Sequence, residues 1–147
     1  RMRIYMDMCC FNRPYDDQSR LQIELETKAK LYIQHLIKNK KLEMVTSFML
    51  RFENSKNPFV MRRDVISDFI DRYSSHFVSS TSLPELEDRI NMIKRTGIRQ
   101  KDATHVACAI FTRCDYFVTT DKRLLKFKSN ELELINPIDF IAELEEN

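Results

Sequence analysis

The sequence predicts an α/β fold with three layers, in which a central parallel β-sheet is flanked by helices on both faces. Short apolar segments alternate along the chain with longer segments of helical periodicity, a pattern typical of βαβ units with right-handed crossovers. Of the 147 residues, 43% are hydrophobic and 31% are charged, which is sufficient for one buried core. No repeat, linker or low-complexity tract divides the sequence, so we expect a single domain over residues 1–147.

The first third of the chain contains two expected strand–helix pairs. Arg3 to Met8 is a short apolar strand that ends at a polar turn. Ser19 to Lys38 has apolar residues near helical spacing, with Lys and Glu between them, and predicts a long amphipathic helix. Leu42 to Thr46 is a second strand, and Ser47 is placed to cap a helix that stops before Pro58.

The middle of the chain repeats this alternation. Phe59 to Tyr73 has helical periodicity, and His76 to Ser80 is a candidate strand. Ser82 and Glu85 are spaced as a capping box, which predicts that a helix begins there and ends near Gly97.

The last third contains the remaining strands. Lys101 to Cys114 predicts a helix with small apolar residues on one face, and Tyr116 to Thr119 is the strand after it. Asp121 to Phe127 is a short helical or turn segment. Leu132 to Ile135 predicts the last strand, and Pro137 to Leu144 a closing helix.

Composition excludes two classes of nucleotide-binding protein. Walker and dinucleotide-binding loops need several glycines so that backbone amides can approach a pyrophosphate, and this chain has only Gly97. The four cysteines form no CxxC pair and no zinc-binding spacing with histidine, which suits a reducing compartment. The sequence has no apolar run long enough to span a membrane, so we expect a soluble cytoplasmic protein.

Charge alone does not indicate a nucleic-acid ligand. The formal net charge is +2, so the overall field is weak. Basic residues nevertheless gather at 94–101 and at 122–128. Each cluster fits either contact with a phosphate backbone or a solvated helix face.

Four acidic residues follow predicted strands or lie on the helices next to them. Asp7 ends the first strand, Glu53 lies on the helix after the second, Asp102 begins the alanine-rich helix, and Asp121 follows the fourth strand. Ligands of parallel α/β sheets bind beyond the carboxyl ends of the strands. We therefore expect the four carboxylates to converge there, where a hard cation such as Mg²⁺ or Mn²⁺ would relieve their mutual repulsion.

Each acid taken singly also has a structural explanation. Asp102 suits the first turn of a helix, Asp121 suits a helix cap, and Glu53 suits an ordinary surface position. Asp7 is harder to explain in this way, because a carboxylate within an apolar stretch needs a partner or a metal if it is buried. The coincidence of all four favours a shared site.

Several segments, in order and at suitable spacing, resemble the PIN-domain family. They are Ile4-Tyr5-Met6-Asp7 with Asn12-Arg13-Pro14, Thr46-Ser47 leading to Glu53, Lys101-Asp102-Ala103-Thr104-His105-Val106-Ala107, and Phe117-Val118-Thr119-Thr120-Asp121. The resemblance covers nearly the whole chain, and the last two segments are its most specific parts. It implies a small PIN-like protein similar to VapC-type toxins, with a three-layer α/β/α fold and metal-dependent endoribonuclease activity.

The resemblance also implies a set of site residues. The acidic quartet that catalyses hydrolysis and binds one or two Mg²⁺ or Mn²⁺ ions would be Asp7, Glu53, Asp102 and Asp121. Thr120 matches the family's small hydroxyl residue, and with Asn12 it would orient ligands or substrate phosphate. His105 falls where the family often has a histidine, but its mid-helix position favours a structural role, so we leave it out of the site. The basic residues that would border the pocket and hold RNA phosphates are Arg13, Arg95, Arg99, Lys101, Lys122 and Arg123.

The expected reaction is hydrolysis of RNA by metal-activated water, without a side-chain nucleophile. Such a site suits both the toxin of a type II toxin–antitoxin pair, with a small antitoxin as partner, and a stand-alone RNA-processing nuclease. A non-catalytic module that binds RNA or protein is a third interpretation, which the four acids disfavour. The apolar stripes of the helices at 19–38 and 59–73 suit either a homodimer or core packing.

Two other acid-bearing folds fit less well. A phosphatase with an aspartyl nucleophile would have a second acid two residues after the first, where this chain has Cys9. A response-regulator receiver would need a paired acid beside the first strand and a lysine after the last strand. The spacing of the four acids therefore favours the PIN-like interpretation.

Overall fold

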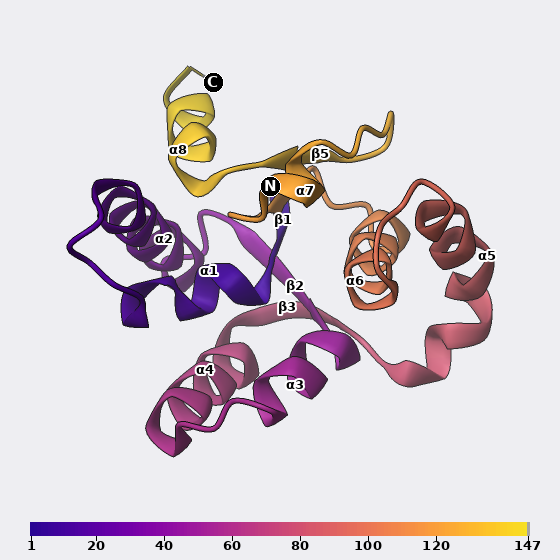
Figure 1. Ribbon diagram of the computed structural model, residues 1–147, viewed down its shortest axis with the longest axis horizontal. Helices are drawn as coiled ribbons and strands as arrows, with labels where there is room; N and C mark the ends of the chain where they lie inside the picture. The colour runs from indigo at the N-terminus through magenta and orange to yellow at the C-terminus, as the bar shows by residue number, and fades with distance from the viewer. Residues whose placement is uncertain (147) are drawn as a thin grey trace.

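A computed structural model describes residues 1–146 as a sheet of five parallel strands between two layers of helices (Figure 1). The strand order is β3-β2-β1-β4-β5, so β1 lies in the centre with β2 and β4 beside it. The expected α/β fold with a central parallel sheet is confirmed. The strands are β1 (Arg3–Met6), β2 (Glu43–Ser47), β3 (Ser74–Val78), β4 (Tyr116–Val118) and β5 (Glu133–Ile135).

Helices cover both faces of this sheet (Figure 1). On one face lie α5 (Leu83–Lys94) and α6 (Gln100–Phe111), which pack in one apolar cluster. The short helix α7 (Lys122–Leu125) contributes Leu124 to the same cluster. The helices that contribute to the second cluster are α1 (Met8–Asn12), α2 (Leu21–Lys38), α3 (Phe48–Ser55), α4 (Val60–Tyr73) and α8 (Pro137–Glu146).

The strands divide their side chains between the two clusters. In β1, Ile4 and Met6 belong to the cluster with α1 and α2, whereas Tyr5 belongs to the cluster with α5 and α6. In β4, Phe117 and Val118 are divided in the same way. Successive side chains of a strand point to opposite faces, so a nearly continuous apolar strand is buried on both sides.

The first strand is shorter than expected, because the apolar residues after it form a helix. Asp7 has extended backbone and accepts a hydrogen bond from Met8 N at 2.9 Å, which caps α1. The backbone oxygen of Asp7 also accepts from Cys10 N at 3.0 Å. A short apolar run fits a strand or a helix equally well by periodicity, and here the acidic cap decides for the helix.

One expected helix cap is confirmed and another is wrong. Ser47 accepts a hydrogen bond from Leu50 N at 3.3 Å and caps α3 as predicted. Ser82 makes no side-chain cap, because its own backbone is already helical. Residues 80–82 form a 3₁₀ turn that is capped by Ser79 instead, so the predicted capping box with Glu85 is absent.

The long helix α2 buries a different face from the one its leucines suggested. Leu21 and Leu25 are exposed, whereas Glu26, Thr27 and Lys30 are buried together with isoleucines. The Lys30 ammonium lies 5.5 Å from the centre of a phenylalanine ring, and burial lowers its pKa to about 8. Polar side chains thus occupy core positions of this helix: Glu26 and Thr27 are hydrogen-bonded there, and the Lys30 ammonium lies over an aromatic ring.

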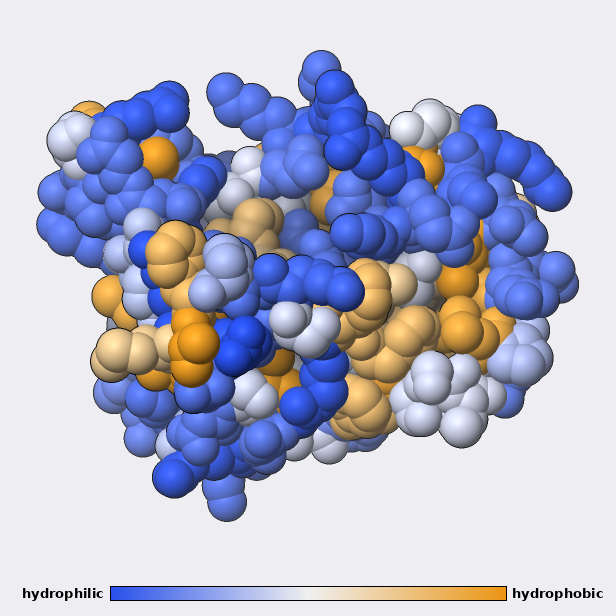
Figure 2. Space-filling view, turned by 60° about the horizontal axis from the view of Figure 1, so that its bottom comes forward, coloured by the Kyte–Doolittle hydropathy of each residue, from blue (hydrophilic) through white to orange (hydrophobic). Residues whose placement is uncertain are grey.

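Apolar side chains remain exposed around α3 and α4. They include Phe52, Phe59, Val60 and Met61. Figure 2 shows apolar side chains among hydrophilic ones on the face that it brings forward. Across residues 1–146, no helix combines the length and the apolar character that crossing a bilayer requires.

Candidate active site

Three of the four acidic residues of the predicted quartet lie in segments that follow strands at the carboxyl edge of the sheet, and the fourth, Asp102, lies in the helix that precedes β4. Asp7 directly follows β1, and Asp121 lies after the neighbouring strand β4. Glu53 is in α3, which continues from β2, and Asp102 is in the first turn of α6. Because β1 lies between β2 and β4, the segments after these strands meet at one place.

Asp7 is a buried carboxylate held by the surrounding chain. Its Oδ2 accepts hydrogen bonds from Thr119 Oγ1 at 2.8 Å and from Cys9 Sγ at 3.4 Å. Burial raises the pKa of Asp7, while His105 and the Thr119 hydrogen bond act in the opposite direction. An ionised carboxylate in such a position is costly without a compensating charge, so the site favours a bound cation.

Glu53 and His105 complete a compact cluster with Asp7. Glu53 Oε1 is hydrogen-bonded to His105 Nε2. One potential ligand atom from each of the three residues lies within 4.8 Å of the others, which makes the cluster suitable for a metal ion. Carboxylate oxygens are the donors that Mg²⁺ and Mn²⁺ prefer.

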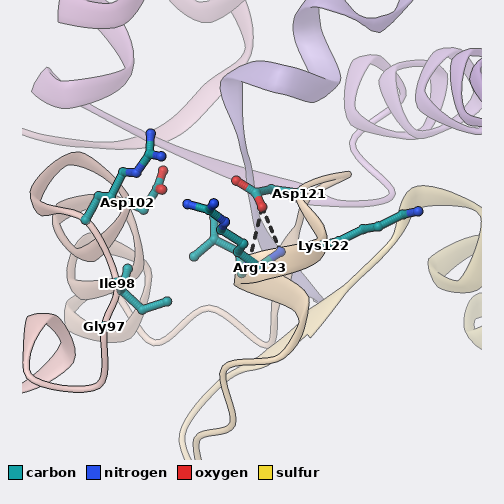
Figure 3. A pocket seen from close by; sticks show the side chains of 8 residues that line it. Gly97, Ile98, Asp102, Asp121, Lys122 and Arg123 are labelled. Atoms are coloured by element: carbon teal, nitrogen blue, oxygen red, sulfur yellow. Dashed lines mark hydrogen bonds between the residues drawn. The ribbon is translucent and has the colours of Figure 1, made fainter.

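Asp102 and Asp121 line a cavity of about 250 Å³ (Figure 3). The pKa of Asp102 is raised, first by burial and then by the charges of Asp7 and Asp121. Asp121 Oδ1 accepts a hydrogen bond from Arg123 N at 2.8 Å and caps α7. The negative charges of Asp7 and Asp121 thus act on Asp102, whereas the potential ligand atoms that lie within 4.8 Å of one another belong to Asp7, Glu53 and His105.

Without divalent cations, we expect stability to fall as the pH rises. The pKa values of Asp7 and Asp102 are raised in the folded chain above their ordinary value of 3.8. At pH values between the ordinary pKa and the raised pKa, the folded chain therefore binds more protons than the unfolded chain. The free energy of unfolding then decreases through that window as the pH increases. Urea unfolding in chelator, from pH 4 to pH 7, should show a smaller decrease for Asp7→Asn. An equal decrease in both proteins would contradict this expectation.

Three of the six expected phosphate-binding residues line the same cavity as the acids. They are Arg99, Lys122 and Arg123. Figure 3 shows Arg123 extending between Asp121 and Asp102, whereas Lys122 points away from the cavity. Positive charge therefore lies next to the acidic residues, as binding of a phosphate near a metal ion requires.

The other three basic residues have different surroundings. Arg13 Nε forms an ion pair of 2.9 Å with buried Glu26, an arrangement that favours a structural role. Lys101 Nζ lies 5.8 Å from the ring centre of Phe52. Arg95 is exposed at the end of α5.

The hydroxyl that contacts Asp7 belongs to Thr119, which sequence reasoning did not single out. Thr120 donates its backbone N–H to Cys9 Sγ at 3.4 Å and lines a separate cavity of about 520 Å³. Asn12 is the last residue of α1 and is partly buried. Sequence alone does not tell which of two adjacent threonines faces the site.

His105 is buried, as its mid-helix position suggested, but it also contacts an acid of the site. A signal for this was present in the sequence. His105 lies three residues after Asp102, and residues three apart share one face of a helix. Once Asp102 is placed at the site, His105 is expected nearby.

Comparisons with known proteins show a likeness at the level of the fold. No protein-family model matches the chain, and no curated protein matches it. Among solved structures, the VapBC2 complex from Rickettsia felis, bound to a DNA fragment from its promoter, contains a similar chain with a TM-score of 0.56 and 13% identity. The likeness covers 92% of this chain and 98% of that one, and it supports the PIN-like fold.

Proposed function

We propose that this chain is a metal-dependent endoribonuclease that hydrolyses RNA phosphodiester bonds, acting as a single PIN-like domain over residues 1–147. The observation that carries the proposal is the cluster of Asp7, Glu53 and His105, whose acids also act by their charge on Asp102 in the cavity that Asp102 shares with Asp121. Asp7, Glu53, Asp102 and Asp121 would bind one or two Mg²⁺ or Mn²⁺ ions. A divalent cation held there lowers the pKa of water and stabilises charge that develops on the phosphate.

The nucleophile in this proposal is water, and three of the four cysteines are buried thiols. Burial raises the pKa of Cys10, and it raises the pKa of both Cys108 and Cys114 to about 12. Thiols of this kind stay protonated at neutral pH and are poor nucleophiles. Cys9 Sγ donates to Asp7 and so supports a carboxylate of the quartet.

The charge around the cavity supports a nucleic-acid substrate. Arg99 and Arg123 line the cavity that Asp102 and Asp121 share. Guanidinium groups bind phosphate oxygens in a bidentate manner, which would position the sugar–phosphate backbone against the acids. In this proposal Thr120 and Asn12 orient the phosphate; Thr120 lines a separate cavity but directly follows Thr119, whose hydroxyl contacts Asp7.

A toxin with a small antitoxin partner is the form of this proposal that the fold likeness supports, because the similar chain belongs to a VapBC complex. The exposed apolar residues of α3 and α4 offer a surface for a protein partner or a second copy of the chain. A stand-alone RNA-processing nuclease would use the same acids. Either form is proposed to act in the cytoplasm.

The proposal is tested by incubating the protein with a mixed pool of structured and unstructured RNA in Mn²⁺, in Mg²⁺ or in chelator. We expect cleavage that requires the metal, and Mn²⁺ binding by calorimetry. Asp102→Asn should lose cleavage while it remains folded. RNA binding without any Mn²⁺ binding would contradict the nuclease and favour a non-catalytic module.

A further inference from the structure

Beneath the carboxylates, a chain of hydrogen bonds runs through the apolar core. Ser47 Oγ lies 2.6 Å from Tyr5 Oη, and Tyr5 Oη lies 2.5 Å from His105 Nδ1. The other nitrogen of His105 contacts Glu53 Oε1. The side chains of Ser47, Tyr5 and His105 are all buried. These hydrogen bonds therefore link β2, β1 and α6 to Glu53 on α3.

These polar groups stand in an otherwise apolar environment. The other buried residues of α6 in the same cluster are apolar, such as Ala103, Val106 and Ala107, together with the thiol of Cys108. Burying polar groups in such a core costs free energy unless each is hydrogen-bonded. Apolar residues would be enough for packing alone. We therefore expect the buried hydrogen bonds to have a role where they end, at Glu53.

The Glu53 carboxylate, as an acceptor, fixes the direction of these hydrogen bonds. A carboxylate only accepts, so His105 Nε2 donates its proton to Glu53. In the neutral ring Nδ1 is then the acceptor, and Tyr5 donates its hydroxyl proton to it. The Tyr5 oxygen in turn accepts from Ser47. Neither nitrogen of His105 is left with a free lone pair.

We propose that His105, supported by Tyr5 and Ser47, is a positioning residue that holds one oxygen of Glu53 and leaves the other for a metal ion, and that His105 is not itself a ligand. The inference rests on the proposed metal site. Such support of a ligand by a hydrogen-bonded neighbour is common around metals. The donors left to the metal are all oxygens, which suits Mg²⁺ and Mn²⁺ better than Zn²⁺.

Ser47 gives the support a second connection. The same oxygen that bonds Tyr5 also accepts from Leu50 N and caps α3, the helix that carries Glu53. The backbone of α3 and the carboxylate of Glu53 are thus both tied to one hydrogen-bonded group. The proposal accounts for this arrangement, because a ligand is best held when its helix and its side chain are fixed together.

Removing the Tyr5 hydroxyl tests the support with little change of shape. In Tyr5→Phe the ring can keep its stacking on Phe117, whose centre is 5.3 Å away. We expect the affinity for Mn²⁺, measured by calorimetry, to fall about tenfold. The matched control Tyr32→Phe, an exposed tyrosine on α2, should bind Mn²⁺ like the wild type. Circular dichroism verifies that both variants are folded.

Two substitutions of His105 separate its two hydrogen bonds. The amide of His105→Gln can reach the position of Nε2 and donate to Glu53, whereas the shorter amide of His105→Asn replaces only Nδ1. We expect His105→Gln to retain more Mn²⁺ affinity than His105→Asn. The reverse order, or equal affinity, would contradict positioning through Glu53.

Spin-echo spectroscopy of bound Mn²⁺ needs no variant. A directly bound imidazole nitrogen couples strongly to the metal, and ¹⁵N-labelled histidine identifies that coupling. We expect no strong coupling in the wild type, and strong coupling would overturn the inference by making His105 a ligand. If the wild type binds Mn²⁺ and Tyr5→Phe binds it equally well, the positioning role alone fails. If the wild type binds no Mn²⁺, the proposed metal site fails as well.

Discussion

We expect Asp7→Asn to abolish metal-dependent RNA cleavage, with a loss of at least about 100-fold in rate. Residues that only orient metal ligands cost 10–100-fold when they are replaced, so the loss of a central ligand should reach or exceed the upper value. The amide removes the negative charge that a cation needs. Its one oxygen can still accept from Met8 N, and its NH2 group, in the place of Oδ2, can donate to Thr119 Oγ1 with the hydroxyl turned. Activity should therefore fall without loss of the fold.

Cleavage kinetics with a defined RNA, together with calorimetric titration of Mn²⁺, check this expectation. The matched control is Asp64→Asn, which makes the same chemical change at an exposed aspartate of α4. The control should cleave like the wild type. Cleavage by Asp7→Asn at the wild-type rate would remove Asp7 from the active site, and the quartet would have to be abandoned.

The main architecture was predictable because each element has a clear period. Alternating strand and helix patterns placed the five strands within a few residues of their observed bounds. The short helix α1 was missed because residues 8–11 are apolar throughout and carry no period. Its cap, Asp7, was interpreted as the end of a strand, although an aspartate is also a strong helix-capping residue.

The candidate acids could be predicted from the sequence by combining residue type with position after a strand. The buried residues that hydrogen-bond to Glu53 and to one another could not be predicted in this way. Ser47, Tyr5 and His105 are far apart in the sequence, and nothing local distinguishes a buried tyrosine that donates a hydrogen bond from one that only packs. The burial of Glu26 in α2 could not be predicted for the same reason. A polar residue at a core position of a helix becomes recognisable only after the buried face is known, because its partners come from other elements.

Glu26 also gives the largest expected effect on stability. Its carboxylate accepts from Arg13 Nε at 2.9 Å, from Gln22 Nε2 at 3.0 Å and from Asn136 Nδ2 at 2.6 Å. Asn136 in turn accepts from Ile138 N at 2.8 Å, at the start of α8. One buried acid thus ties α2 both to the segment after α1 and to the last helix of the chain.

We expect Glu26→Ala to lower the free energy of unfolding by about 3 kcal/mol, because breaking a buried ion pair leaves the remaining charge uncompensated. The effect should lie at the low end of the range for buried pairs, since Arg13 is partly exposed and keeps its ion pair with Asp16. Urea unfolding at neutral pH measures it. The control Asp68→Ala breaks an exposed pair with Arg72 and should cost no more than about 0.5 kcal/mol. Equal losses in the two variants would show that Glu26 acts as a surface charge, and its burial between α2 and α8 would then contribute nothing to the fold.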